Sequence, residues 1–281
     1  MKNLTKASVC KLSAGMGIAL MSVLSLMPLT ASAADSSYDL LKAADPELNK
    51  QYVKSAFGKI QNKKFNNGDS RKKLLLIGDS QAQDFLNSVL ENDELKGYQI
   101  RTRHIPAQCQ PYLGDPLKSG VEGKDQALCE KVESLAKAKP QIANADVIVI
   151  ASLWRDWAVK SLPQTIENMQ LRENQKLVIV GRKGFGRISL RHYLRMSGVK
   201  RAGLKNTINA KFLNENNLLK RSLPAHVFVD QYALVCGNGQ KKCPVFTPSA
   251  ELISFDGGHL TKEGAKFVGE KIFRSQALSD L

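Results

Sequence analysis

The sequence predicts an α/β fold in which a parallel sheet is covered by helices on both faces. From Lys72 onward, short apolar segments alternate with segments of helical periodicity. The apolar segments are nearly continuous, which is typical of strands buried on both faces of a parallel sheet. The predicted strands are residues 74–77, 98–104, 146–151, 177–181 and 227–230.

Apolar residues with helical spacing lie between these strands. They mark four helices, which contain Phe85, Leu86, Val89 and Leu90; Leu128, Val132 and Leu135; Ile208, Phe212 and Leu219; and Ala265, Val268, Ile272 and Phe273. Thr261 is suited to cap the last of them. Sheets of this kind place their sites at the carboxyl ends of the strands, so functional residues are expected there.

The first residues of the chain have the features of a secretory signal peptide. Three lysines lie among the first eleven residues, residues 15–29 are apolar, and residues 31–33 form a small-residue cleavage site. An uncleaved membrane anchor is the alternative, but Pro28 ends the apolar segment and the cleavage signature follows directly. We therefore predict a periplasmic or secreted protein, cleaved near Ala33.

The remaining chain has the length of one well-buried domain. Residues 1–33 are the predicted signal peptide, residues 34–71 an N-terminal helix and basic linker, and residues 72–281 the main domain. Cleavage removes three lysines and no acidic residue, so the net charge falls from +15 to +12. Such a charge favours anionic partners such as an acidic cell-envelope glycan or lipid headgroups, the alternative being a merely solvated basic surface. Nucleic acid is not expected, because the protein is exported and has no basic-aromatic motif.

Four cysteines remain after cleavage, and an even number in an exported chain indicates two disulfides. Of the three possible connectivities, we predict Cys109–Cys129 and Cys236–Cys243, because each pair brackets a loop bounded by turn residues. A zinc site is the alternative, which the absence of a Cys-x-x-Cys pair disfavours. No metal or cofactor is expected.

Ser80 directly follows the first predicted strand in a Gly-Asp-Ser turn. Gly78 permits a tight turn, and Ser80 would lie at a helix N-terminus, where free N–H groups can stabilise an oxyanion. The alternative is that Asp79 and Ser80 only cap the helix. The same tripeptide ends at Ser70, but polar residues surround it, so no buried strand presents that serine.

Asp256 and His259 lie three residues apart with two glycines between them. This spacing lets the carboxylate orient the imidazole as a base towards a serine, although Asp256 could instead merely cap the turn. The other histidines are expected to be structural or surface residues; they are His104, His192 and His226. A serine, an aspartate and a histidine in this order indicate acyl-group chemistry.

Residues 76–80 and 256–260 resemble the first and last sequence blocks of the SGNH/GDSL hydrolases. The likeness is strongest to the SGNH domain fused to membrane acyltransferases that O-acetylate bacterial surface polysaccharides, and it runs from about residue 74 to 273. It implies a three-layer α/β/α sandwich with a central parallel sheet (SGNH/flavodoxin-like). It also implies that Ser80 is the nucleophile, His259 the base and Asp256 its orienting partner.

The chain departs from the family pattern at the oxyanion hole, where a glycine and an asparagine are typical. Residues 151–156 contain no asparagine, and the Ser80 N–H is the only donor that can be named. Trp154 and Arg155 are expected to line the site, with packing as the alternative for Trp154. A Gly-rich basic loop is expected to contact an anionic glycan, the alternatives being a phosphate-binding loop or an ordinary surface loop; its cations are Arg182, Lys183 and Arg187.

These features predict an exported serine esterase or O-acyltransferase that acts on acetyl esters of a cell-envelope polysaccharide through an acyl-serine. A separate membrane acyltransferase is expected to supply the acyl groups. One alternative is a small-ester or lipid esterase. The other is a non-catalytic glycan-binding accessory protein that retains the fold.

Overall fold

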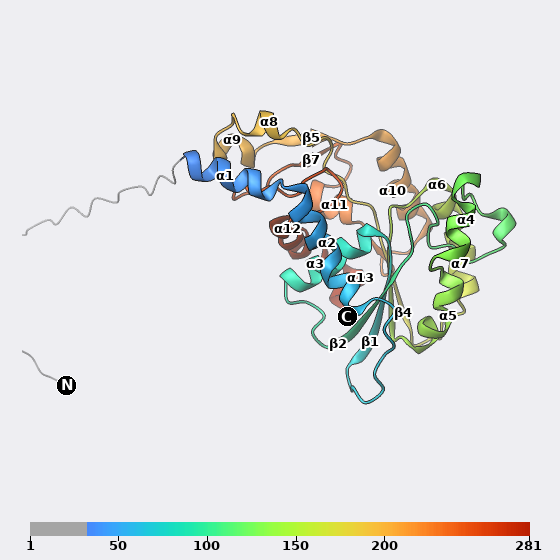
Figure 1. Cartoon of the computed structure of the whole chain (residues 1–281). Helices are drawn as coiled ribbons and strands as arrows, with labels where there is room; N and C mark the ends of the chain where they lie inside the picture. Colours follow the sequence, from blue (N-terminus) through green and yellow to red (C-terminus); the bar gives the residue numbers. More distant parts are fainter. Residues whose placement is uncertain (1–32) are drawn as a thin grey trace, which may run out of the picture. The chain divides into compact units, whose positions relative to one another are not determined.

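The computed structural model describes residues 33–281, so the predicted signal segment lies outside the described residues up to residue 32. The central sheet has five strands, all parallel, in the order β2-β1-β3-β4-β6 (Figure 1). Their bounds are Lys72–Gly78 for β1, Tyr98–His104 for β2, Val147–Ala151 for β3, Lys176–Val180 for β4 and Phe228–Val229 for β6. The predicted α/β fold with a central parallel sheet is confirmed.

Alternate residues of the central strands pack on opposite faces of the sheet. Leu74 and Leu76 of β1 belong to one hydrophobic cluster, and Leu75 and Ile77 belong to another. A strand points successive side chains to opposite faces, so four consecutive apolar residues require a helical layer on each side. Burying each such side chain stabilises the fold by about 1.5–3 kcal/mol, so the continuous apolar pattern strongly favours a sheet that is covered on both faces.

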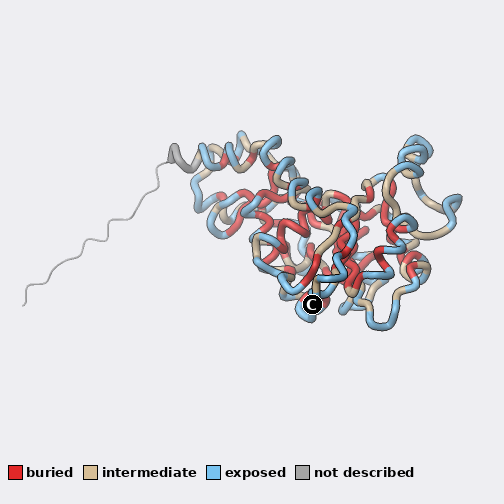
Figure 2. The backbone as a smooth tube through the Cα atoms, turned by 60° about the horizontal axis from the view of Figure 1, so that its bottom comes forward, coloured by how far each residue is buried: buried red, intermediate tan, exposed pale blue. Residues whose placement is uncertain are grey.

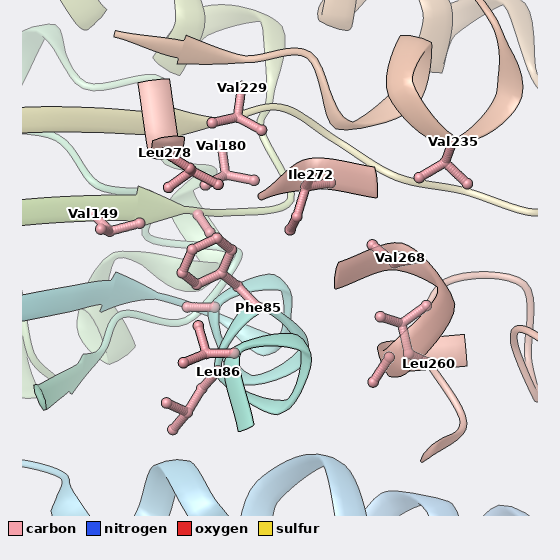
Figure 3. Close-up of a cluster of buried hydrophobic side chains, with 14 of the residues drawn as sticks. Phe85, Leu86, Val149, Val180, Val229, Val235, Leu260, Val268, Ile272 and Leu278 are labelled. Carbon is pink, nitrogen blue, oxygen red and sulfur yellow. The ribbon is translucent and has the colours of Figure 1, made fainter. Parts of the chain in front are cut away.

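Two groups of helices form the outer layers (Figure 1). One face is covered by α2 (Pro46–Ile60), α3 (Ser80–Glu91), α11 (Gln231–Cys236), α12 (Lys262–Ile272) and α13 (Gln276–Ser279). Figure 3 shows this cluster, in which Phe85 of α3 lies between the sheet and Ile272 of α12. The other face is covered by α5 (Leu135–Asn144), α6 (Asp156–Lys160), α7 (Leu162–Met169) and part of α10 (Ala210–Ser222).

The segment before the sheet is helical and contributes to the buried interior (Figure 2). Asp45 caps α2 by accepting hydrogen bonds from the N–H groups of Glu47 and Leu48. Phe57 of α2 is fully buried in the same cluster as Leu74. The preceding helix α1 (Ala33–Ala43) places Leu40 in a separate cluster.

That separate cluster underlies a small subdomain that the sequence pattern did not predict. It contains α8 (Leu190–Tyr193), α9 (Gly198–Ala202) and an antiparallel ribbon of β5 (Lys205–Thr207) and β7 (Lys242–Pro244). Tyr193 and Phe246 pack edge to face at its centre. The ribbon strands have three residues each, which is too short to show an apolar periodicity.

The helix predicted around Leu128, Val132 and Leu135 is wrong in its extent, because two helices occupy this segment. They are α4 (Gly123–Lys131) and α5, and Val132 between them has extended backbone. Ser134 starts α5 by accepting a hydrogen bond from the Lys137 N–H. A short 3₁₀ turn, η1 (Pro116–Lys118), precedes α4.

Both disulfides have the predicted pairing. Cys109–Cys129 joins the segment after β2 to α4, and Cys236–Cys243 joins the end of α11 to β7. Helix α4 has no buried residue, so the first disulfide is a principal attachment of this helix. Between residues 33 and 281, no helix combines the length and apolarity that a membrane span requires.

Replacing both Cys109 and Cys129 with alanine is expected to release α4 while leaving the sheet folded. Closing a loop of this length stabilises a protein by about 3 kcal/mol, so the free energy of unfolding should fall by about that amount. Hydrogen exchange should become faster in residues 110–131 and stay slow in β1 and β3. Unchanged protection of α4 would contradict this account.

Candidate active site

The turn after β1 is determined by a close approach between two strands. Gly78 ends β1 with φ +148°, and a Cβ atom there would overlap the carbonyl oxygen of Ala151 at the end of β3. Only glycine fits this position. The chain then enters α3 directly, so Ser80 becomes the first residue of that helix at the carboxyl edge of the sheet.

Asp79 is almost fully buried and ties α3 to the end of β3. Its Oδ1 accepts a hydrogen bond from the Gln81 N–H, and its Oδ2 accepts from the Ser152 hydroxyl and the Leu153 N–H, each at 2.8 Å. Asp79 therefore caps α3. Ser80 is half-buried, and within the described residues its hydroxyl forms no hydrogen bond, to His259 or to any other group.

Asp256 and His259 form a hydrogen-bonded pair. The His259 Nδ1 lies 2.6 Å from Asp256 Oδ2, while Asp256 Oδ1 accepts from the N–H groups of Gly258 and His259, each at 2.8 Å. Asp256 thus both caps the turn and orients the ring. Burial alone raises the pKa of Asp256, but these hydrogen bonds outweigh it and lower the pKa to about 2. The carboxylate is therefore charged at neutral pH and can stabilise a protonated His259.

The Gly-rich loop after β4 braces the loop that carries this pair. The Phe185 N–H donates to the Gly257 carbonyl oxygen at 2.8 Å. Gly257 has φ +92°, and a Cβ atom there would overlap the Gly186 carbonyl oxygen. The Ser254 hydroxyl adds a local brace, donating to the His259 carbonyl oxygen and accepting from the Gly257 N–H.

A buried ion pair joins α3 to both loops. Lys183 Nζ lies 2.7 Å from Asp84 Oδ2 and 2.9 Å from Gln81 Oε1. Asp84 lies one turn after Ser80, and its oxygens accept from the Leu260 N–H, next to His259, at 3.3 Å. This network connects the helix that carries the serine to the loop that carries the histidine.

This geometry changes the interpretation of Lys183, which sequence analysis placed on an exposed basic loop. Its side chain is 2 % exposed and is paired with Asp84. Asp84 and Gln81 were missed by sequence analysis. The available signal was a cluster of polar residues at the start of an otherwise apolar helix, on the turns that follow Ser80.

The other predicted contact residues fall into two groups. Trp154 is fully buried, and its Nε1 donates a hydrogen bond to the Val180 carbonyl oxygen, which indicates a packing role. Trp154 also lines a cavity of about 420 Å³ beside Asp256. Arg155 and Arg182 line the same cavity. Arg187 is exposed and does not line it.

A family model described as the SGNH domain (fused to AT3 domains) matches residues 48–274. This chain belongs to the SGNH domain family. One solved structure with the same fold is the periplasmic domain of a lipopolysaccharide acetyltransferase from Salmonella ser. Paratyphi A, with a TM-score of 0.53 and 14 % sequence identity. The match covers 86 % of this chain and 98 % of that one, and at this identity it shows a shared fold. Comparison with curated proteins gave no match.

Membership in the SGNH family supports an acyltransferase or esterase type of function. The other three histidines are a packed residue on β2 and two exposed residues. His104 lies opposite Gly78 on β2 and packs edge-on against Phe57. Burial lowers the pKa of His104, which favours its neutral form. His192 and His226 are exposed.

Two polar groups that follow β3 in this SGNH domain lie close to the turn that carries Ser80. Ser152 follows β3, and its hydroxyl and the Leu153 N–H both donate to Asp79. These two donors are therefore engaged in holding the turn. The N-terminus of α3, with the Ser80 N–H, remains the source of positive potential beside the serine.

Lys183→Met is expected to destabilise the domain strongly, because it leaves the Asp84 carboxylate buried without its counter-charge. Losing one partner of a buried ion pair costs about 3–5 kcal/mol, measurable by urea denaturation. The matched control is the double variant Lys183→Met/Asp84→Leu, which removes both charges and should recover part of the loss. If Lys183→Met were as stable as the wild type, the ion pair between Lys183 and Asp84 would not hold these segments together.

Asp256→Asn should be less stable than the wild type at neutral pH, and the difference should shrink in acid. The pKa of Asp256 falls from 3.8 to about 2 on folding, so its stabilising contribution is present above pH 4. The contribution disappears as pH falls through about 2. Unfolding free energies of both proteins measured from pH 7 downward test this, and a pH-independent difference would exclude this origin.

Proposed function

We propose that this chain is an exported serine esterase or O-acyltransferase that acts on acetyl esters of a cell-envelope polysaccharide. The observation that carries the proposal is the oriented pair of Asp256 and His259, tied through Asp84 to the helix that begins at Ser80. Two disulfides and the predicted signal peptide support export to an oxidising compartment such as the periplasm.

The proposed reaction forms and then breaks an acyl-serine. The Ser80 Oγ attacks the acyl carbonyl carbon while His259 accepts the hydroxyl proton. The tetrahedral intermediate collapses, His259 returns the proton to the departing alcohol oxygen, and the acyl group stays on Ser80. Water or a sugar hydroxyl then attacks the acyl-serine, giving hydrolysis or transfer, and the proton passes back through His259 to Ser80.

The missing hydrogen bond between Ser80 and His259 is compatible with this scheme. Catalytic hydrogen bonds are often long in a free enzyme and shorten when substrate binds. Asp256 remains charged throughout, because its pKa is about 2, and its role is to orient and stabilise the imidazolium. The positive end of α3 would stabilise the oxyanion. A membrane acyltransferase, as in the fused members of the family, is the proposed source of acyl groups.

One observation favours a second candidate, a non-catalytic glycan-binding accessory protein. The Ser152 hydroxyl and the Leu153 N–H both donate to Asp79, so neither of them faces an oxyanion. Such a protein would bind glycan equally well with or without Ser80. A small-ester or lipid esterase would instead turn over simple esters and ignore the glycan.

Ser80→Ala should reduce turnover of an aryl acetate and of acetylated glycans by at least about a thousandfold, because it removes the nucleophile. The matched control is Ser70→Ala, which alters the same Gly-Asp-Ser tripeptide in an exposed segment and should act like the wild type. Intact mass spectrometry should detect one acetyl group on the wild type and none on Ser80→Ala. Wild-type turnover by Ser80→Ala would refute the proposal.

A further inference from the structure

The cavity is built from four segments at the carboxyl edge of the sheet. They are the segment after β3, the Gly-rich loop after β4, the start of α10 and the loop that carries Asp256. Its volume of about 420 Å³ lies within the range of small-ligand sites, about 300–1,000 Å³. Because Asp256 forms part of the wall and binds His259, a molecule in this cavity would lie beside the candidate base.

Cations outnumber carboxylates around this cavity. Arg155, Arg182 and Lys211 line it, together with the carboxylates of Glu215 and Asp256. Glu215 and Arg182 form an ion pair, so their charges offset each other. The Asp256 carboxylate keeps its charge and is hydrogen-bonded to the His259 ring.

The three cations differ in how far their charge is available. Lys211 is exposed, and within residues 33–281 it has no ion-pair partner. Arg155 shares the exposed Glu122 with Lys124, which leaves part of its charge unbalanced.

Arg182 is the most buried of the three cations, and Glu215 offsets its charge. Its guanidinium lies 4.7 Å from the centre of the Phe212 ring, and its Nε is buried without a hydrogen-bond partner in the described part of the chain. Burial lowers the pKa of Arg182 to about 10, so it stays charged at neutral pH.

Two further features complete the cavity. Asn209 caps α10, a helix of 13 residues, so the positive end of this helix lies at the cavity wall. Leu153 is 38 % exposed and gives the cavity an apolar surface.

We propose that this cavity is a subsite for a sugar unit that carries an anionic group, a carboxylate or a phosphate. Lys211 pairs with the anion, the partly unbalanced charge of Arg155 adds positive potential, and Leu153 contacts the ring. This inference rests on the proposed function, since the sugar would be the unit whose ester reaches Ser80. It also replaces the predicted set of cations, because Lys183 is buried and Arg187 does not line the cavity.

The first test compares three acetyl esters as substrates of the mature protein: those of methyl glucuronoside, of glucose 6-phosphate and of methyl glucoside. The wild type should show a higher kcat/KM for the two charged esters, and rising salt should reduce that preference. Lys211→Gln should lower the charged-to-neutral ratio of kcat/KM at least about tenfold, as expected for losing one hydrogen bond to a charged group. The control is Lys139→Gln on α5, an exposed lysine outside the cavity, which should keep the wild-type ratio.

The second test measures binding without catalysis. Calorimetric titration of Ser80→Ala with unacetylated methyl glucuronoside, glucose 6-phosphate and methyl glucoside should show tighter binding of the charged sugars, lost in Ser80→Ala/Lys211→Gln. This selectivity without any ester turnover in the wild type would sustain the subsite and refute the proposed function. Turnover with equal preference for charged and neutral esters, unaffected by Lys211→Gln, would refute the subsite alone.

Discussion

The buried ion pair between Asp84 and Lys183 is the interaction on which the arrangement of the site depends. It connects α3, the loop after β4 and the loop before α12. Asp84 lies 99 residues before Lys183 and 176 residues before Leu260 in the sequence. Burying two charges is favourable only when geometry and hydrogen bonds are good, and here Gln81 and the Leu260 N–H supply the additional hydrogen bonds. The cost of breaking the pair makes the relative position of Ser80 and His259 hard to change.

Three aspartates within this site have three separate roles, which their surroundings determine. Asp79 accepts only neutral donors and locks the turn after β1 to the end of β3. Asp84 is a buried counter-ion for Lys183. Asp256 lies at the surface, contacts the His259 ring and is the one whose charge the proposed reaction would use. The residue type alone therefore does not assign the role.

The strong positive charge of the chain is informative only after its residues are placed. Of the three cations that the Gly-rich loop contributes, one is buried against Asp84, one forms a wall of the cavity and one points to solvent. Lys211, which no motif distinguishes, is the exposed cation that lines the cavity. Net charge predicts non-specific attraction, whereas a site needs charges that converge on one space.

The sequence by itself determined the features that depend on local patterns. Apolar segments predicted the sheet, because strands that are buried on both faces consist of nearly continuous apolar residues. The disulfide pairing was predicted because each cysteine pair brackets a loop bounded by turn residues. The pair of Asp256 and His259 forms within a single turn. The position of Ser80 followed from its place directly after a buried strand.

Tertiary structure alone decided the features that depend on contacts between distant segments. Lys183 looked exposed because its neighbours in sequence are basic and Gly-rich, while its partner Asp84 lies 99 residues away on another element. The same holds for the short ribbon of β5 and β7, the break between α4 and α5, and the cavity lined by Lys211. Each depends on packing against residues that are distant in the sequence. Long-range electrostatic and packing energies set these features, and short-range periodicity does not encode them.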